Sequence, residues 1–170
     1  VIAICKENEA VQIEVAPPAQ ERAALWKARK SISGACGKIN PTKIGEDIAV
    51  PPAAIPAMIK AVKEIAQKYN LNMVVFGHAG DGNLKPNIMT DKRNTEEMAR
   101  VNQAIDELFA RALALGGTLS GEHGIGFMKA PYLLQELGRE GYLAHKAVKD
   151  ALDPAEILNP GKIFIEKELG

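Results

Sequence analysis

The chain has 170 residues, 46% of them hydrophobic and 25% charged, which is the range of globular domains and not of disordered chains. Lysine plus arginine equals aspartate plus glutamate at 21 each, and only 5% is aromatic, so neither a basic field nor a stacking surface points to nucleic acid. Cys5 and Cys36 form no metal-ligand pair and no disulfide framework, and no apolar stretch is long enough to span a bilayer. We therefore expect a cytoplasmic protein, or one attached peripherally to a membrane.

The first third of the sequence predicts two helices separated by a strand. "VIAICKENEA" is typical of the end of a helix, and because Val1 is not a methionine we expect a fragment of a longer chain, with its N-terminal part missing. The alternating, β-rich residues 11–16 predict a strand that ends at Pro17 and Pro18. Residues 18–38 are rich in alanine, with charges on one side, and predict a helix.

The middle of the sequence alternates strands and helices. Residues 43–51 predict a short strand ended by a proline pair, and 53–70 predict an amphipathic helix with apolar residues at 55, 58, 59, 62 and 65. Residues 71–77 and 83–89 predict two strands around a glycine-rich turn, and 95–117 predict a long helix with a Gly-Gly stop. The hairpin-like pair favours an antiparallel sheet in an α+β fold.

Short helices dominate the last third. The segments "APYLLQEL", "GYLAHKAVKDAL" and "PAEIL" predict helices, and Pro160 and Gly161 predict a turn. We therefore expect two parts, an α+β part over 1–117 and a small helical subdomain over 118–170.

Residues 74–88, "VVFGHAGDGNLKPNI", run from a strand into a polar, glycine-rich turn. After the turn, Asn83, Lys85 and Asn87 recur with period two and share one face of the second strand. Leu84, Pro86 and Ile88 take the other face, which we expect to meet the core. His78 ends the first strand beside the turn, so the polar face is organised rather than scattered.

A second glycine loop repeats this glycine spacing. Gly121, Gly124 and Gly126 in "SGEHGIG" have the spacing of Gly77, Gly80 and Gly82, and each loop carries a histidine. Neither loop has the order of a dinucleotide-binding fingerprint, and Glu122–His123 lacks the second histidine of a helical zinc-protease motif. By spacing alone, a shared ligand site and two ordinary glycine turns are equally good interpretations.

Five motifs in order resemble one known family. "LWKARKS", "KIGEDIAVP", "GHAGDGNLKPNI", "SGEHGIG" and "LDPAEILNPGKIF" resemble the C-terminal domain of FAD-linked oxidases of the vanillyl-alcohol oxidase superfamily, of the glycolate oxidase, D-lactate dehydrogenase and D-2-hydroxyglutarate dehydrogenase type. The resemblance implies a ferredoxin-like antiparallel sheet with flanking helices and a small C-terminal helical subdomain. It also implies a substrate-binding cap over FAD, which a separate N-terminal domain mainly holds.

The resemblance implies roles for individual residues. Arg29 and Lys43 correspond to residues that hold the substrate carboxylate, and Asn87 to an asparagine that faces the substrate. His123 corresponds to the histidine beside the α-hydroxyl, a base whose ordinary pKa of ~6.5 suits proton abstraction at neutral pH. Asn159, in the last motif, is implied as a cofactor-binding residue. His145 corresponds to no family residue, and we expect it on a helix surface.

The resemblance also implies a divalent zinc or manganese site, from which this sequence departs. His78 and Glu122 correspond to metal ligands, but Lys85 stands where relatives commonly have the second histidine ligand. A protonated lysine has no lone pair to donate, so the metal site should be weakened, or the ammonium of Lys85 takes the vacant place beside the substrate.

The implied function is oxidation of a small 2-hydroxy acid, glycolate or D-lactate, by an FAD-dependent oxidoreductase. The partners would be the FAD domain of the same chain and other oxidase subunits or an electron acceptor. Two alternatives remain at this stage: a non-catalytic metal- or anion-binding module, and an interaction subunit that pairs with a separate flavoprotein.

Overall fold

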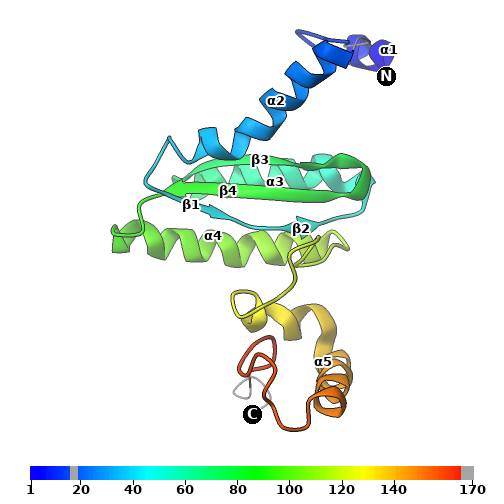
Figure 1. Cartoon of the computed structure of the whole chain (residues 1–170). Helices are drawn as coiled ribbons and strands as arrows, with labels where there is room; N and C mark the ends of the chain where they lie inside the picture. The colour runs from blue at the N-terminus through cyan, green and yellow to red at the C-terminus, as the bar shows by residue number, and fades with distance from the viewer. Residues whose placement is uncertain (16–18, 166–170) are drawn as a thin grey trace. The chain divides into compact units, whose positions relative to one another are not determined.

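The structure is a computed structural model that describes residues 1–15 and 19–165. It divides into two compact units, Val1–Ile39 and Asn40–Gly170 (Figure 1).

The N-terminal unit holds two helices, α1 (Ile2–Glu7) and α2 (Ala19–Cys36), so the predicted helix over 18–38 is confirmed to within two residues at its C-terminal end. The predicted strand over 11–16 is wrong. Residues 11–15 form no strand, and Ala16 lies outside the described residues together with Pro17 and Pro18. A strand needs a neighbour for its backbone hydrogen bonds, and the described part of this unit contains none.

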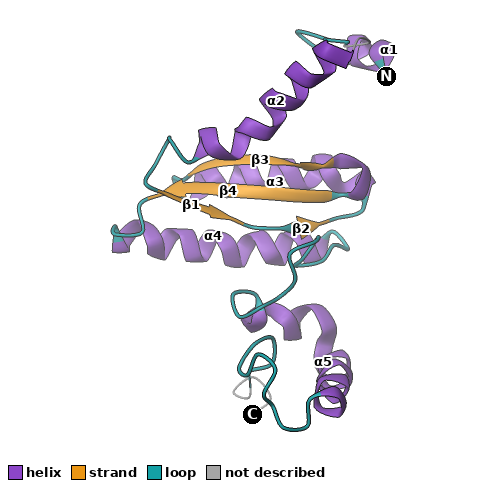
Figure 2. Ribbon diagram, viewed as in Figure 1, coloured by secondary structure: helices purple, strands orange, loops and turns teal. Residues whose placement is uncertain are grey.

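The second unit contains an antiparallel sheet built around one central strand (Figure 2). The strands are β1 (Thr42–Gly45), β2 (Ile48–Ala49), β3 (Asn72–His78) and β4 (Asn83–Thr90). β4 pairs with β3 along one edge and with β1 and then β2 along the other. The predicted hairpin over 71–89 is confirmed, while the predicted strand over 43–51 is split in two.

The register of the sheet decides which side chains share a face. Gly45 pairs with Asn87 and Ile48 pairs with Leu84, so the register is the same on both sides of the interruption, and Asp47 lies opposite Lys85. Glu46, beside Asp47, donates its backbone N–H to the Pro86 carbonyl at 2.8 Å.

Two helices supply the rest of the core. A short 3₁₀ turn, η1 (Pro52–Ala54), leads into α3 (Ile55–Lys68), and α4 (Thr95–Ala114) follows the sheet. Asn94 caps α4 by accepting a hydrogen bond from the Glu97 N–H, as helix N-termini require. The two helices bury their apolar faces against β2 and β4 in one cluster, which includes Ile48, Met58, Val62, Ile65, Leu84, Ile88, Val101, Ala104, Leu108 and Phe109.

The predicted core face of β4 is confirmed. Leu84, Pro86 and Ile88 are buried, and Leu84 and Ile88 belong to the cluster between sheet and helices. The opposite face carries Asn83, Lys85 and Asn87, as their period of two predicted.

The C-terminal segment begins with η3 (Ala130–Tyr132) and α5 (Leu133–Leu152), which changes direction at Gly138 (φ 65°, ψ 174°). Glu136 of α5 accepts hydrogen bonds from the Thr118 hydroxyl at 2.5 Å and the Leu119 N–H at 3.2 Å. Thr118 in turn forms an antiparallel bridge with Ala49. These contacts fasten the start of α5 to the edge of the sheet.

The predicted helix "PAEIL" is wrong. Asp153 takes the N–H groups of Ile157 and Leu158 at 3.1 and 3.0 Å, and Glu156 has a φ of 51°, which a helix does not permit. The segment is therefore a turn. Within the described ranges, every helix is too short or too polar to cross a membrane.

Candidate functional site

The centre of the polar sheet face is Asp47, a fully buried carboxylate between β1 and β2 (0% exposed). It lies on the strand edge that faces Lys85 of β4. A carboxylate removed from water requires hydrogen-bond donors or positive charge around it. Its donors come from three separate parts of the sequence.

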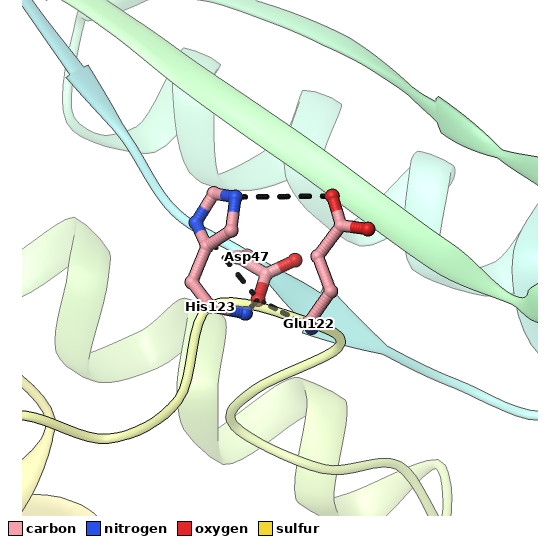
Figure 3. Close-up of side chains that lie close together, drawn as sticks. All are labelled: Asp47, Glu122 and His123. Carbon is pink, nitrogen blue, oxygen red and sulfur yellow. Dashed lines mark hydrogen bonds and ion pairs between the residues drawn. The ribbon is translucent and has the colours of Figure 1, made fainter.

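The loop 120–124 supplies the first donors. Oδ2 of Asp47 accepts the backbone N–H of Glu122 at 2.9 Å and of His123 at 2.8 Å (Figure 3). The Ser120 hydroxyl lies 3.4 Å from the same oxygen. The Ser120 oxygen in turn accepts the Gly124 N–H at 2.7 Å. Asp47 therefore holds this loop, more than 70 residues later in the chain, against the sheet.

Gly121 permits this close approach. A Cβ atom at this position would lie 1.6 Å from Nδ2 of Asn83 and 3.0 Å from Oδ1 of Asp47. A side chain at position 121 would overlap the Asn83 amide, so a glycine there lets the loop approach the sheet this closely.

Asn83 and Lys85 of β4 supply the second set of donors. Asn83 donates Nδ2 to Oδ1 of Asp47 at 2.8 Å, and the Lys85 ammonium lies 3.4 Å from the same oxygen. Lys85 also donates to Oε1 of Glu122 and lies 3.3 Å from Nε2 of His123. One ammonium therefore contacts the side chains of three acidic or basic residues from two distant segments.

Lys129, which directly precedes η3, supplies the third contact. Its buried ammonium donates to the backbone carbonyls of Asp47 and Leu119, both at 2.6 Å, and lies 4.0 Å from Oδ2 of Asp47. Burial lowers the pKa of Lys129, against the attraction of Asp47 and Glu46. Burial likewise raises the pKa of Glu46, although the Lys129 charge opposes this.

The charge of Asp47 is stabilised strongly. Burial alone would raise its pKa, but the N–H groups of Glu122 and His123, the Asn83 amide and the Lys129 charge outweigh burial. The net effect holds the pKa of Asp47 well below its ordinary value, so it is ionised at neutral pH. The hydrogen bond and charge of Lys85 lower the pKa of Glu122 as well.

The open side of the site presents Glu122 and His123. The His123 side chain is 59% exposed and that of Glu122 52%, and Nε2 of His123 lies 3.8 Å from Oε1 of Glu122. Together with Asp47 they offer three possible metal-ligand atoms within 4.8 Å of one another. Among the described residues this is the group with metal-ligand geometry, and its centre is already contacted by the Lys85 ammonium.

The structure places three further predicted site residues on the same sheet face. His78, the last residue of β3, pairs with Asn83, and its charge contributes to the low pKa of Glu122. Asn87 is buried and donates Nδ2 to the Lys85 carbonyl at 2.6 Å. Lys43 pairs with Met89, two residues beyond Asn87 along the strand. The roles of all three stay predictions.

The remaining predicted residues lie elsewhere. Arg29 is on α2 in the N-terminal unit, and Asn159 lies in the turn after α5 with a φ of 51°. Their roles also stay predictions. His145 is exposed on α5 and hydrogen-bonds the Gly141 carbonyl, as expected for a helix-surface histidine.

Asp47 and Lys129 were not among the predicted site residues. The sequence offered a weak signal for Asp47, a charged residue inside the strand-like "KIGEDIAVP". It offered none for Lys129, whose partners are backbone carbonyls of distant segments.

Comparison with known proteins identifies the family. The family model described as FAD linked oxidases, C-terminal domain, matches residues 1–163. This chain belongs to that family. It is 52% identical over 162 residues to the glycolate oxidase subunit GlcD of Bacillus subtilis, covering 95% of this chain and 34% of that protein.

More distant relatives carry other names. The chain is 35% identical to a probable mitochondrial D-lactate dehydrogenase of Danio rerio, covering 95% of this chain and 33% of the relative. It is 33% identical to a D-2-hydroxyglutarate dehydrogenase of Xanthomonas citri, covering 85% and 31%. The chain thus spans about a third of the length of these relatives.

Proposed function

We propose that this chain is the substrate-binding and catalytic cap of an FAD-dependent 2-hydroxy-acid oxidoreductase of glycolate or D-lactate type. The observation that carries the proposal is the meeting of Lys85, Glu122 and His123 around Asp47. The family model covers both segments that supply these side chains. Relatives named for three kinds of 2-hydroxy-acid enzyme match 85% to 95% of this chain.

His123 is the proposed base that takes the proton of the substrate's α-hydroxyl. Its backbone is fixed by Asp47, while its imidazole is more than half exposed and so accessible to a small acid. A positioned imidazole is the side-chain group that most often serves as a general base at neutral pH.

Arg29 and Lys43 are the proposed partners of the substrate carboxylate, and Asn87 a proposed substrate contact. The role of Lys43 is supported by its position, because it lies on the same face of the sheet as Lys85 and Asp47. An arginine fork suits the two oxygens of a carboxylate. For Arg29 the support is the "LWKARKS" motif alone.

FAD, when bound, would accept the hydride from the α-carbon. This chain spans about a third of the length of its relatives. We propose that a separate domain holds most of the FAD and that this chain, with Asn159, meets it only at the substrate side.

We further propose a ferredoxin-like topology for the α+β part. The supporting facts are the βαββα order, the central position of β4 and the Ala49–Thr118 bridge, which stands where a fourth strand would pair. Residues 118–170 would form the helical subdomain. The name of the Bacillus relative, a glycolate oxidase subunit, supports other subunits as partners, and a cytoplasmic location remains our expectation.

The test uses the polypeptide that contains these residues together with its FAD-binding part. Reduction of an artificial electron acceptor is measured with glycolate and with D-lactate. We expect turnover of at least one acid, and a fall in kcat of about 100-fold or more in His123→Gln, with His145→Gln unchanged. Absence of turnover with both acids, or an unchanged kcat in His123→Gln, would refute the proposal.

The 170 residues alone should carry no flavin after purification. A stoichiometric flavin absorbance spectrum from this chain would contradict the proposed division of labour.

A further inference from the structure

Lys85 occupies an unusual position for a lysine, in the middle of the central strand with a side chain only 14% exposed. Lysine is rarely buried unless its charge is paired. The register places it opposite Asp47, and the loop 120–124 brings Glu122 and His123 to the same ammonium.

The contacts of this ammonium match its bonding capacity. An ammonium has three N–H donors and no acceptor. Its neighbours are Oδ1 of Asp47 at 3.4 Å, Nε2 of His123 at 3.3 Å and the Glu122 carboxylate. These are the three residues that offer metal-ligand atoms, so Lys85 lies where a metal ion would have to bind.

The carboxylate of Asp47 has little capacity left for a metal. Oδ2 accepts two backbone N–H groups and lies near the Ser120 hydroxyl, and Oδ1 accepts the Asn83 amide. The ionised Asp47 and Glu122 are already balanced by Lys85 and Lys129, which lies 4.0 Å from Asp47. A divalent ion would add two positive charges beside two ammonium groups.

We propose that the ammonium of Lys85 is the resident cation of this site and that Asp47, Glu122 and His123 hold it in place of a divalent metal ion. The residues present therefore do not fit the metal that the family resemblance implies. One consequence rests on the proposed function: the ammonium would stabilise negative charge that develops on the α-oxygen of the substrate. The exclusion of metal does not depend on that function.

The experiment measures metal binding directly. Titration calorimetry with zinc chloride and with manganese chloride is carried out on the wild-type chain, Lys85→His, Lys85→Met and the control His145→Ala, all treated with a chelator first. Lys85→His supplies a nitrogen ligand, and Lys85→Met removes the charge without adding a nitrogen or oxygen donor.

We expect wild type and His145→Ala to show equal, weak binding. Lys85→His should bind at least about 100-fold more tightly, since even outer-shell contacts change metal affinity by about 10- to 100-fold. Lys85→Met should lie between the two, because only the repulsion has been removed. The proposal is overturned if wild type binds as tightly as Lys85→His, or if neither variant gains affinity.

A second measurement needs no variant. Bound Mn²⁺ is paramagnetic and broadens NMR signals of nearby nuclei, so the imidazole signals of His123 and His145 are compared in the wild-type chain at equimolar Mn²⁺. We expect equal, slight broadening of both. Selective loss of the His123 signals would show that the metal binds beside Lys85 and would overturn the proposal, while the proposed 2-hydroxy-acid activity would remain open to its own test.

Discussion

Replacing Asp47 by asparagine keeps the shape of the side chain and removes the charge on which the loop 120–124 depends. The two backbone N–H bonds from Glu122 and His123 change from charge-assisted to neutral, a loss of about 1 kcal/mol each. Asn83 can turn its amide so that Oδ1, which has no partner among the described residues, accepts from the new amide. That hydrogen bond is therefore retained.

A loss of similar size comes from Lys129, whose buried ammonium lies 4.0 Å from Oδ2 of Asp47. Removing one partner of a buried ion pair costs about 3–5 kcal/mol, and the loss here is smaller because Lys129 keeps two carbonyl acceptors. We set this part at about 2 kcal/mol, below that range, because the charges are 4.0 Å apart. The free energy of unfolding should then fall by about 4 kcal/mol in all.

The assay is urea unfolding followed by circular dichroism, with a fall in Tm on the order of 10 °C as a second measure. The matched control is Asp150→Asn, which removes an exposed ion pair with Lys146 on α5 and should cost less than about 0.5 kcal/mol. A loss below about 1 kcal/mol in Asp47→Asn would refute the view that this carboxylate fastens the loop to the sheet.

Three further outcomes follow from the same contacts. Gly121→Ala should lower the free energy of unfolding by about 1–3 kcal/mol, because the new Cβ would overlap the Asn83 amide. The control Gly80→Ala should change it little, because no atom lies within 4 Å of a Cβ at that position. Urea unfolding of both variants checks this. Lys129→Met should cost about 3 kcal/mol or more in the same assay, since it leaves Asp47 buried without that charge, and the exposed Lys60→Met should cost almost nothing. The pKa of Asp47 is lower in the folded protein than in the unfolded chain, so its contribution to the free energy of unfolding is complete above pH ~4 and is lost as the pH falls further. The free energy of unfolding of Asp47→Asn should therefore fall less steeply with acid than that of wild type. An equal slope in both proteins would contradict the assignment.

The sheet and its covering helices could be predicted because their signals are local. The alternation of Leu84, Pro86 and Ile88 with Asn83, Lys85 and Asn87 is enough to predict both faces of β4. The helical period over 53–70 did the same for α3, whose Met58, Val62 and Ile65 are buried as expected. In each case one short stretch of sequence contains the whole pattern.

Prediction failed where structure depends on distant partners. Residues 11–15 alternate like a strand, but alternation gives only a face, and no strand is described in that unit to pair with it. The role of Asp47 could not be predicted from a periodic pattern or a motif, because its donors lie 36 to 82 positions away in the chain. The spacing of the two glycine loops did not distinguish a shared ligand site from two ordinary turns, and it gave no sign that Gly82 and Gly121 lie against the protein's own Val50 and Asn83.

The same sheet geometry accounts for both the stability of the site and its chemistry. Residues directly opposite each other on neighbouring strands lie on the same face of a sheet, so the register alone brings Asp47 next to Lys85. Backbone N–H groups then bind the loop 120–124 to Asp47, and the side chains of Glu122 and His123 contact Lys85 while about half of each stays exposed. The buried charges hold the loop, and the exposed groups are those that we propose to meet the substrate. A substitution at Asp47 should therefore disturb folding and catalysis together, whereas one at His123 should disturb catalysis alone, and comparing kcat with the free energy of unfolding in the two variants separates these roles.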